Sequence, residues 1–227
     1  MNFTCLAEAE VLAGAKIEAN CLILGDCEKI LPFVPKCDAV ITDPPYGINI
    51  AANPFRGKHA KREWDKVAPS LDFLPDCLKI IWGGNYFDLP AQQGFLIWDK
   101  VQPENLSSSQ VEYAWHNLQK PAKLFRRHVV SYEKFHPTTK PIELMRWCVA
   151  QLPESAQTIF DPFMGSGTTC VAAIEMGRKF IGIEREPSYF EIAKRRCEEA
   201  FWRCDMELKS KPGEIDLWNF DKQEEKQ

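Results

Sequence analysis

Four consecutive residues, Asp43, Pro44, Pro45 and Tyr46, place a carboxylate, two prolines and an aromatic ring directly after the apolar run Ala39–Thr42. The prolines fix φ near about −65° and carry no amide donor, while their carbonyl oxygens can accept hydrogen bonds. If the apolar run is a buried strand of an open α/β sheet, these groups lie at its carboxyl end, where such sheets bind ligands. A flat ligand with an amino group would suit them. Because Asp and Pro are also ordinary turn residues, this motif alone leaves a plain strand exit equally open.

A second motif shifts the balance towards a ligand site. The run Thr158–Phe160 leads into a turn that contains Gly165 and Gly167, and a helix-like stretch begins at Cys170. Glycines let the backbone turn tightly and approach a ligand closely, and the following helix start presents unpaired N–H groups. A dinucleotide site would normally have a third glycine where Cys170 stands, so a pyrophosphate ligand is less expected.

A third candidate is Glu184, which ends the apolar run Lys179–Ile183. In sheets of this kind an acidic residue at about this spacing from the glycine turn binds ribose hydroxyls. Together with the missing third glycine, Glu184 indicates a pocket for a nucleoside that lacks a diphosphate.

The elements that must position these residues follow from the hydrophobic pattern. Short apolar runs that end in Gly or Asp predict buried strands at 21–24, 39–42, 80–83 and 94–98. Apolar residues spaced three and four apart, each stretch with a proline suited to its first turn, predict helices over 141–151 and 188–201. Strands that alternate with helices predict an α/β fold with a doubly wound, largely parallel, Rossmann-like sheet.

With these motifs the chain resembles the S-adenosylmethionine-dependent DNA amino-methyltransferases. Their two hallmark motifs are Asp-Pro-Pro-Tyr, here Asp43–Tyr46, and Phe-x-Gly-x-Gly, here Phe163–Gly167. The resemblance spans roughly Leu22 to Ala200 and extends to Gly25-Asp26, His136–Pro141 and Gly182–Glu184. The catalytic motif precedes the cofactor loop, as in the beta arrangement of that family, which implies a circularly permuted methyltransferase sheet.

The resemblance implies a set of site residues. Asp43, Pro44, Pro45 and Tyr46 would be catalytic: the Asp43 carboxylate and the Pro44 carbonyl would each accept an N–H from the amino group of a flipped base, and Tyr46 would stack on that base. The residues implied for S-adenosyl-L-methionine are Asp26, Thr138, Lys140, Asp161, Phe163, Gly165, Ser166, Gly167, Thr168 and Glu184. For two of these a plainer role is also open, since Thr138 could only cap the next helix and Lys140 could only be a solvated charge.

Asn85 and Tyr86 are further candidates for the base pocket. They follow Gly83-Gly84 at the end of a predicted strand, although two glycines can equally form an ordinary turn. In the family, aspartate at the first motif position usually accompanies adenine-N6 methylation and serine more often accompanies cytosine-N4 methylation. The resemblance therefore implies a site-specific, adenine-directed DNA methyltransferase. A cytosine-N4 enzyme, an RNA or protein-amide methyltransferase, and a noncatalytic DNA-binding protein on the same scaffold stay open as alternatives.

Length and charge limit the domain organisation and the partners. A chain of 227 residues with 45% hydrophobic residues predicts one catalytic domain, 1–208, followed by a charged, mobile tail at 209–227. We expect target recognition in a short insertion at about 99–136, hence a brief recognition sequence in double-stranded DNA or the help of a homodimer. The net charge of −4 argues against a broadly basic surface. Local basic residues could contact phosphates or simply be solvated: Arg56, Lys58, Lys61, Arg62, Lys120, Lys123, Arg126, Arg127, Lys134 and Lys140.

Other sequence features favour a cytoplasmic protein without membrane or metal partners. No segment approaches the roughly 18 to 20 continuous apolar residues of a membrane span, and the first 20 residues do not follow the pattern of a signal peptide. The nine cysteines form no Cys-x-x-Cys pair, which favours reduced packing thiols. The four histidines have no zinc-site spacing, so we expect no metal.

Overall fold

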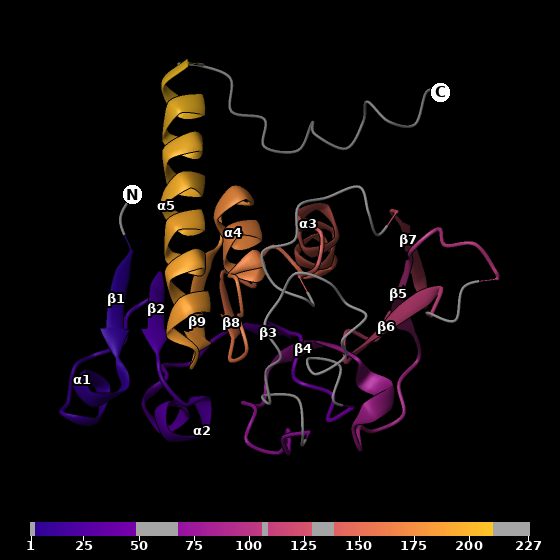
Figure 1. Ribbon diagram of the computed structural model, residues 1–227, viewed down its shortest axis with the longest axis horizontal. Coiled ribbons are helices and arrows are strands. Elements are labelled where there is room, and N and C mark those ends of the chain that lie inside the picture. The colour runs from indigo at the N-terminus through magenta and orange to yellow at the C-terminus, as the bar shows by residue number, and fades with distance from the viewer. Residues whose placement is uncertain (1–2, 49–67, 106–108, 129–138, 211–227) are drawn as a thin grey trace.

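The computed structural model describes residues 3–48, 68–105, 109–128 and 139–210, and these form one mixed sheet flanked by helices (Figure 1). The strands are β1 Thr4–Ala7, β2 Cys21–Leu24, β3 Ala39–Thr42, β4 Leu78–Trp82, β5 Phe95–Asp99, β6 Val111–His116, β7 Lys123–Arg126, β8 Thr158–Asp161 and β9 Lys179–Glu184. The helices are α1 Glu8–Leu12, α2 Cys27–Ile30, α3 Ile142–Gln151, α4 Thr168–Glu175 and α5 Pro187–Ser210, with short 3₁₀ helices η1 Leu31–Phe33 and η4 Gly84–Tyr86.

The nine described strands lie in the order β1-β2-β9-β8-β3-β4-β6-β5-β7. Neighbouring strands pair in parallel except where β6 meets β4 and β5, so β6 runs opposite to the other described strands. The predicted doubly wound, largely parallel Rossmann-like sheet is therefore confirmed. Its circular permutation stays a prediction.

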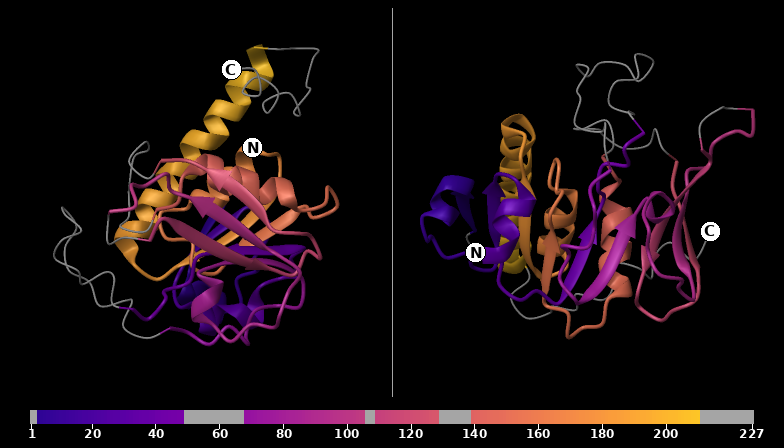
Figure 2. Two further views of the ribbon diagram at one scale, coloured as in Figure 1. Left: turned by 90° about the vertical axis from the view of Figure 1, so that its right-hand side faces the viewer. Right: turned by 90° about the horizontal axis from the view of Figure 1, so that it is seen from below.

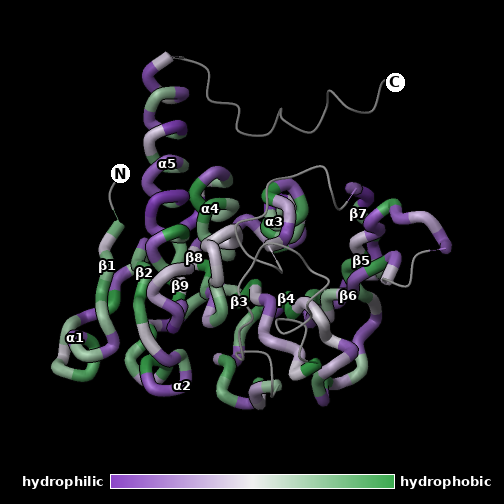
Figure 3. Tube along the Cα trace, viewed as in Figure 1, coloured by the Kyte–Doolittle hydropathy of each residue, from purple (hydrophilic) through white to green (hydrophobic). Residues whose placement is uncertain are grey.

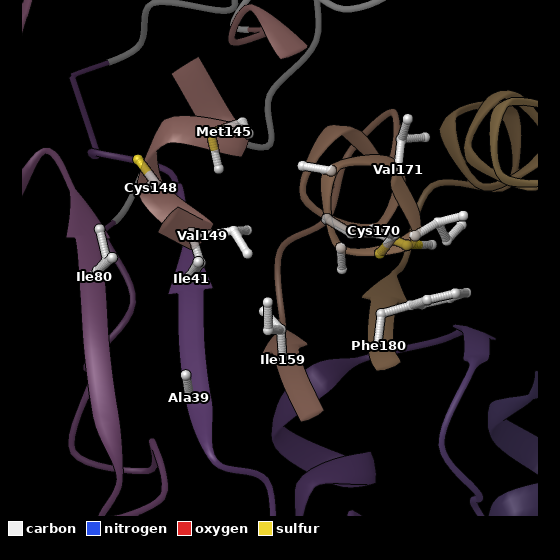
Figure 4. Close-up of a cluster of buried hydrophobic side chains, with 14 of the residues drawn as sticks. Ala39, Ile41, Ile80, Met145, Cys148, Val149, Ile159, Cys170, Val171 and Phe180 are labelled. Atoms are coloured by element: carbon white, nitrogen blue, oxygen red, sulfur yellow. The ribbon is translucent and has the colours of Figure 1, made fainter. Parts of the chain in front are cut away.

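Both faces of the sheet are buried, because alternate residues of the central strands enter two different cores. In β3, Ala39 and Ile41 belong to the core beneath α3, α4 and α5, whereas Val40 belongs to the core on the side of α1 and α2. Figure 2 shows α3 to α5 on one side of the sheet and the two short helices on the other. Figure 4 shows Ile41, Ile80 and Ile159 of the strands on the side of Met145, Cys148 and Val149 of α3 and Cys170 of α4. This burial on both faces explains why these strands read as unbroken apolar runs.

Most of the predicted elements are confirmed, with shifts of one or two residues at their ends, but the last helix runs to Ser210 instead of ending at Phe201. The predicted strands at 21–24 and 39–42 coincide with β2 and β3, and Pro141, predicted in the first turn of its helix, stands directly before α3. The insertion expected at about 99–136 supplies β6 and β7, which extend the sheet. The predicted tail begins at Lys209, which with Ser210 still belongs to α5, while 211–227 lie outside the described residues.

The far half of α5 is mostly hydrophilic where it projects past the sheet (Figure 3). Within the described part of the chain, no helix combines the length and apolar character that crossing a bilayer requires. All nine cysteines are free thiols, and many of them pack in the two cores.

Candidate active site

The three sequence motifs meet at one edge of the sheet. Because β2, β3, β8 and β9 are parallel, their carboxyl ends, which carry Asp26, Asp43, Asp161 and Glu184, lie at the same edge. From the neighbouring strands β3 and β8 the chain continues in opposite directions, to β4 and to β9, which makes this point the expected ligand crevice of the sheet. A cavity of about 430 Å³ lies there.

Ten of the predicted site residues line this cavity: Asp26, Asp43, Pro45, Lys140, Asp161, Phe163, Gly165, Ser166, Thr168 and Glu184. Pro44, Tyr46 and Gly167 are adjacent to lining residues but are not themselves part of the wall. Thr138 lies outside the described residues. The lining includes Tyr189 of α5 and Cys27 of α2, which no motif indicated.

The Asp43 carboxylate is held by two donors. Its Oδ1 accepts a hydrogen bond of 2.5 Å from the Tyr46 hydroxyl, and its Oδ2 accepts one of 2.6 Å from the Lys140 ammonium. The side chain is 18% exposed. Burial raises the pKa of Asp43 above its ordinary value, while the positive charge of Lys140 acts against that rise.

The Tyr46 ring depends on a glycine for its place. Gly83, after β4, has φ +68°, and a Cβ there would lie 2.1 Å from the Tyr46 ring. Tyr86 stacks on Tyr46 with ring centroids 4.8 Å apart and an interplanar angle of 16°. The prediction that Tyr86 lies near the catalytic motif is thereby confirmed, and Gly83 is the residue that allows it.

The turn after β8 needs glycine at two positions for different reasons. Gly167 has φ +78°, and a Cβ there would lie 2.8 Å from the Cβ of Ala193 on α5, so this glycine allows close packing. Gly165 has φ +52°, and a Cβ there would meet nothing within 4 Å, because this residue borders the cavity. Both are αL positions, which non-glycine residues rarely adopt.

Arg196 on α5 fixes the same turn from behind. Its Nη1 donates to the Ser166 hydroxyl at 3.1 Å and to the Thr168 hydroxyl at 3.0 Å, and it also bonds the Ser166 carbonyl. No sequence pattern indicated this residue, since an arginine in a polar helix is usually solvated.

The other carboxylates at the cavity are engaged in part by the protein itself. Asp161 is 3% exposed, and its Oδ1 accepts from the Thr42 hydroxyl at 2.7 Å and the Phe163 amide at 3.1 Å. Burial raises the pKa of Asp161 to about 6 and that of Glu184 to about 7. The Asp26 carboxylate caps α2 through the Glu28 amide at 3.0 Å.

One interpretation of the sequence placed Lys140 on an exposed basic surface, but the structure does not. Lys140 is buried, and its ammonium lies 3.1 Å from Glu112 as well as 2.6 Å from Asp43. Glu112 in turn pairs with Lys100 at 2.6 Å. No motif indicated Glu112, because a single glutamate outside any motif is usually a solvent-facing residue.

The other described members of the predicted basic clusters are partly engaged within the protein. Arg126 pairs with Asp99 and Arg127 with Glu143, whereas the Lys120 ammonium donates to a backbone carbonyl. The basic residues at 56–62 and Lys134 lie outside the described residues. Across the described ranges, no three His, Cys, Asp or Glu side chains group so that they could hold a metal ion.

Comparison with known proteins points to one family. A family model described as DNA methylase matches residues 78–195, which include the glycine turn and Lys140 but not Asp43. The chain is 28% identical over 228 residues to the type II methyltransferase M2.LlaDCHI of Lactococcus lactis subsp. cremoris, a match that covers 74% of this chain and 84% of that protein. It is 46% identical over 63 residues to the type II methyltransferase M2.DpnII of Streptococcus pneumoniae, covering 28% of this chain and 24% of that protein.

Solved structures are similar as well. The complex of M1.HpyAVI with S-adenosylmethionine has a TM-score of 0.52 at 25% identity and covers 77% of this chain and 97% of that one. The cytosine-N4-specific PvuII DNA methyltransferase has a TM-score of 0.53 at 16% identity, covering 80% and 91%, which speaks for the fold alone. Since the family model spans just over half of the chain, the protein belongs to the DNA methylase family and is an S-adenosylmethionine-dependent DNA methyltransferase of the N6/N4 amino-methyltransferase type.

Proposed function

We propose that this DNA methyltransferase acts on the exocyclic N6 of adenine in double-stranded DNA, with Asp43, Pro44, Pro45 and Tyr46 as its catalytic residues. The observation that carries the proposal is the position of the Asp43 carboxylate: Asp43 directly follows β3 and lines the same cavity as the glycine turn after β8. Aspartate rather than serine at this position supports adenine as the target, following the usual correlation in the family.

The cavity fits S-adenosylmethionine. Gly165 leaves open space where a Cβ would stand, which suits close approach of a ligand to the backbone. Glu184, at the end of β9, is the acid we assign to the ribose hydroxyls, and Asp26 lies at the end of the neighbouring β2. When bound, the cofactor would supply the electrophilic methyl group of its sulfonium, and with the methyl carbon–sulfur bond broken it would leave as a neutral thioether.

Asp43 and Pro44 act on the other reactant. An exocyclic amino nitrogen is a poor nucleophile, because its lone pair is delocalised into the base. If the Asp43 carboxylate and the Pro44 carbonyl each accept one N–H, the nitrogen becomes more tetrahedral and its lone pair can point at the methyl group. A productive arrangement places the reacting atoms about 3 to 3.5 Å apart. The nitrogen gives up one proton as the new C–N bond forms, and the Asp43 carboxylate is within reach to accept it.

The target base has to leave the duplex to reach Asp43, as is general for enzymes that modify a base. Tyr46, hydrogen-bonded to Asp43, is the aromatic surface we assign to the flipped base, with Tyr86 beside it. Tyr86 is 45% exposed, so it can change its side-chain position without opening the core. We assign target recognition to the 99–136 segment. A homodimer would compensate for the short length of this segment.

The test is to incubate purified protein with unmethylated duplex DNA and S-adenosylmethionine, digest the DNA, and identify methylated nucleosides by mass spectrometry. N6-methyldeoxyadenosine supports the proposal if Asp43→Ala makes none and still binds the cofactor in calorimetry. N4-methyldeoxycytidine would keep the mechanism and overturn the base. An active Asp43→Ala protein would remove Asp43 from the mechanism.

A further inference from the structure

A continuous set of charged contacts connects the catalytic motif to the far strands of the sheet. The Tyr46 hydroxyl donates to Asp43, Lys140 bridges Asp43 and Glu112, and Lys100 binds the other oxygen of Glu112. The four N–O and O–O distances are 2.5, 2.6, 3.1 and 2.6 Å in that order. Two carboxylates and two ammonium groups thus alternate, and the set is neutral overall.

Lys140 is the central member, and it is fully enclosed. Its side chain is 6% exposed, and its ammonium lies over the Trp82 ring at 5.3 Å from the centroid. The ammonium has oxygen neighbours in Asp43, Glu112 and, at 3.5 Å, the Tyr46 hydroxyl, which matches its three donors. A buried lysine with one carboxylate would direct its whole charge at that carboxylate, whereas here it is shared between two.

The charges have opposite effects on the two carboxylates and on the lysine. Burial alone would lower the pKa of Lys140, but Asp43 and Glu112 raise it well above its usual range, so the ammonium stays charged. Burial would raise the pKa of Glu112, but Lys140 and Lys100 lower it to about 2. The ionised form of Asp43 is stabilised by fewer cations than that of Glu112, because Lys140 is the one direct ion-pair partner of Asp43 within the described residues.

We propose that Lys140 and Glu112 are positioning residues for Asp43: Lys140 keeps the carboxylate ionised and fixes its orientation, and Glu112 limits how strongly Lys140 binds it. This inference rests on the proposed role of Asp43 as acceptor for the amino group. If Lys140 were bound to Asp43 alone, the carboxylate would be ionised but a weaker acceptor for the base. Glu112 takes part of the lysine's charge and leaves Asp43 available.

Glu112 and Lys100 bring the recognition segment into this arrangement. Glu112 lies in β6 and Lys100 directly follows β5, both within the segment that we assign to target recognition. A shift of β5 and β6 would therefore change the distance between Lys140 and Glu112, and with it the strength of the Lys140 contact to Asp43.

Other titratable groups also face Asp43 and enter its pH dependence. Tyr46, on the same loop, donates to Asp43 and stays protonated, since burial and the nearby carboxylates raise its pKa well above the ordinary value. Asp161, the last residue of the neighbouring β8, interacts with Asp43 as a like charge, and burial raises the pKa of Asp161 to about 6. A valid test must therefore change Lys140 and Glu112 separately while Tyr46 and Asp161 remain in place.

The primary experiment measures the pKa of Asp43 in the free protein by carbon-13 NMR of its carboxyl group, assigned with Asp43→Asn. Lys140→Met should raise this pKa by about one to three units, the usual effect of removing an adjacent opposite charge. Glu112→Gln should shift it downward, because a nearby like charge is lost. Glu199→Gln, the same chemical change on the exposed face of α5, should leave it unchanged. Equal or same-direction shifts for Lys140→Met and Glu112→Gln would overturn the inference, and Glu112→Gln decides it alone if Lys140→Met does not fold.

The second readout is the pH dependence of kcat. The acid limb should move to higher pH in Lys140→Met and to lower pH in Glu112→Gln, and Lys140→Arg should restore most of the original profile. An active enzyme whose acid limb stays in place in both variants would contradict the positioning role. A wild-type protein without methylated product, or an active Asp43→Ala protein, would refute the proposed function instead, and the NMR shifts would still decide the charge arrangement.

Discussion

Alanine substitutions at three glycines with positive φ can distinguish residues of the cofactor turn that are needed for packing from those that are needed for ligand binding. Gly165, Gly167 and Gly177 have φ of +52°, +78° and +67°, so alanine is strained at all three. A Cβ at Gly165 or Gly177 would meet nothing within 4 Å, but Gly165 borders the cavity and Gly177, which follows α4, does not. At Gly167 a Cβ would lie 2.8 Å from the Cβ and 3.1 Å from the Cα of Ala193. Gly177→Ala therefore introduces backbone strain alone, Gly165→Ala adds a methyl group at the cavity, and Gly167→Ala adds a close contact with Ala193.

The expected losses of stability follow from these environments. The αL strain costs about 1–2 kcal/mol at each position. The contact with Ala193 adds about 1–3 kcal/mol for overpacking, because the α5 backbone cannot move away as a flexible side chain could. For a chain of this size each kcal/mol lowers Tm by about 2–4 °C. Gly165→Ala and Gly177→Ala should thus lose stability about equally, and Gly167→Ala clearly more.

Cofactor binding should divide the same variants differently. Thermal unfolding without ligand gives the stability order, and calorimetric titration with S-adenosylmethionine gives the affinity of each variant. Gly165→Ala should bind the cofactor at least about tenfold more weakly, equivalent to about 1.4 kcal/mol, while Gly177→Ala keeps the original affinity. An unchanged affinity in Gly165→Ala would refute the placement of the cofactor against this turn. Equal stability of Gly167→Ala and Gly177→Ala would refute the packing argument.

Three further predictions concern residues around the cavity. Since burial raises the pKa of Glu184 from 4.5 to about 7, the folded state holds its proton more tightly than the unfolded state, and the stabilisation present below pH 4.5 is lost as the pH rises through 7. Urea unfolding from pH 4.5 to 8 should show this loss relative to Glu184→Gln, and parallel curves would contradict it. Arg196→Leu, which releases Ser166 and Thr168, should weaken calorimetric cofactor binding about tenfold, whereas the exposed Arg195→Leu should not. Tyr46→Phe removes the 2.5 Å hydrogen bond to Asp43 but keeps the ring, so kcat should fall about tenfold at unchanged cofactor affinity, and an unchanged kcat would exclude that hydrogen bond from the mechanism.

The sequence predicted the strands that carry the site because their environment is simple. β2 and β3 are buried on both faces, so every residue of each strand had to be apolar or small, and the runs ended where the chain reached the cavity. The glycine turn was recognisable for a similar reason, since a positive φ and a close approach to α5 restrict the residue type locally. Such constraints are visible in a few consecutive letters.

Three strands were not predicted: β1 and β7 at the two edges of the sheet, and β6 between β4 and β5. β1 and β7 have four residues each with several exposed positions, so their hydrophobic pattern is weak. β6 contains Glu112 and ends at His116, and the apolar alternation expected of a half-buried strand is interrupted there. Pairing with β4 and β5, rather than local propensity, decides the conformation of this segment.

The contacts of Lys140 show why long-range partners escape a reading of the sequence. β4 lies between β3 and β6, so Asp43 and an acid on β6 can share an ion-pair partner only if its side chain crosses β4. Lys140 does so by passing over the Trp82 ring of β4, 5.3 Å from its centroid, and this crossing requires a long, flexible and charged side chain. In the sequence the same lysine stands between a threonine and a proline before a helix, where a solvated charge is the ordinary interpretation. Its role depends on the strand order, which places Glu112 on one side of Trp82 and Asp43 on the other, and no local pattern around any of these residues contains that order.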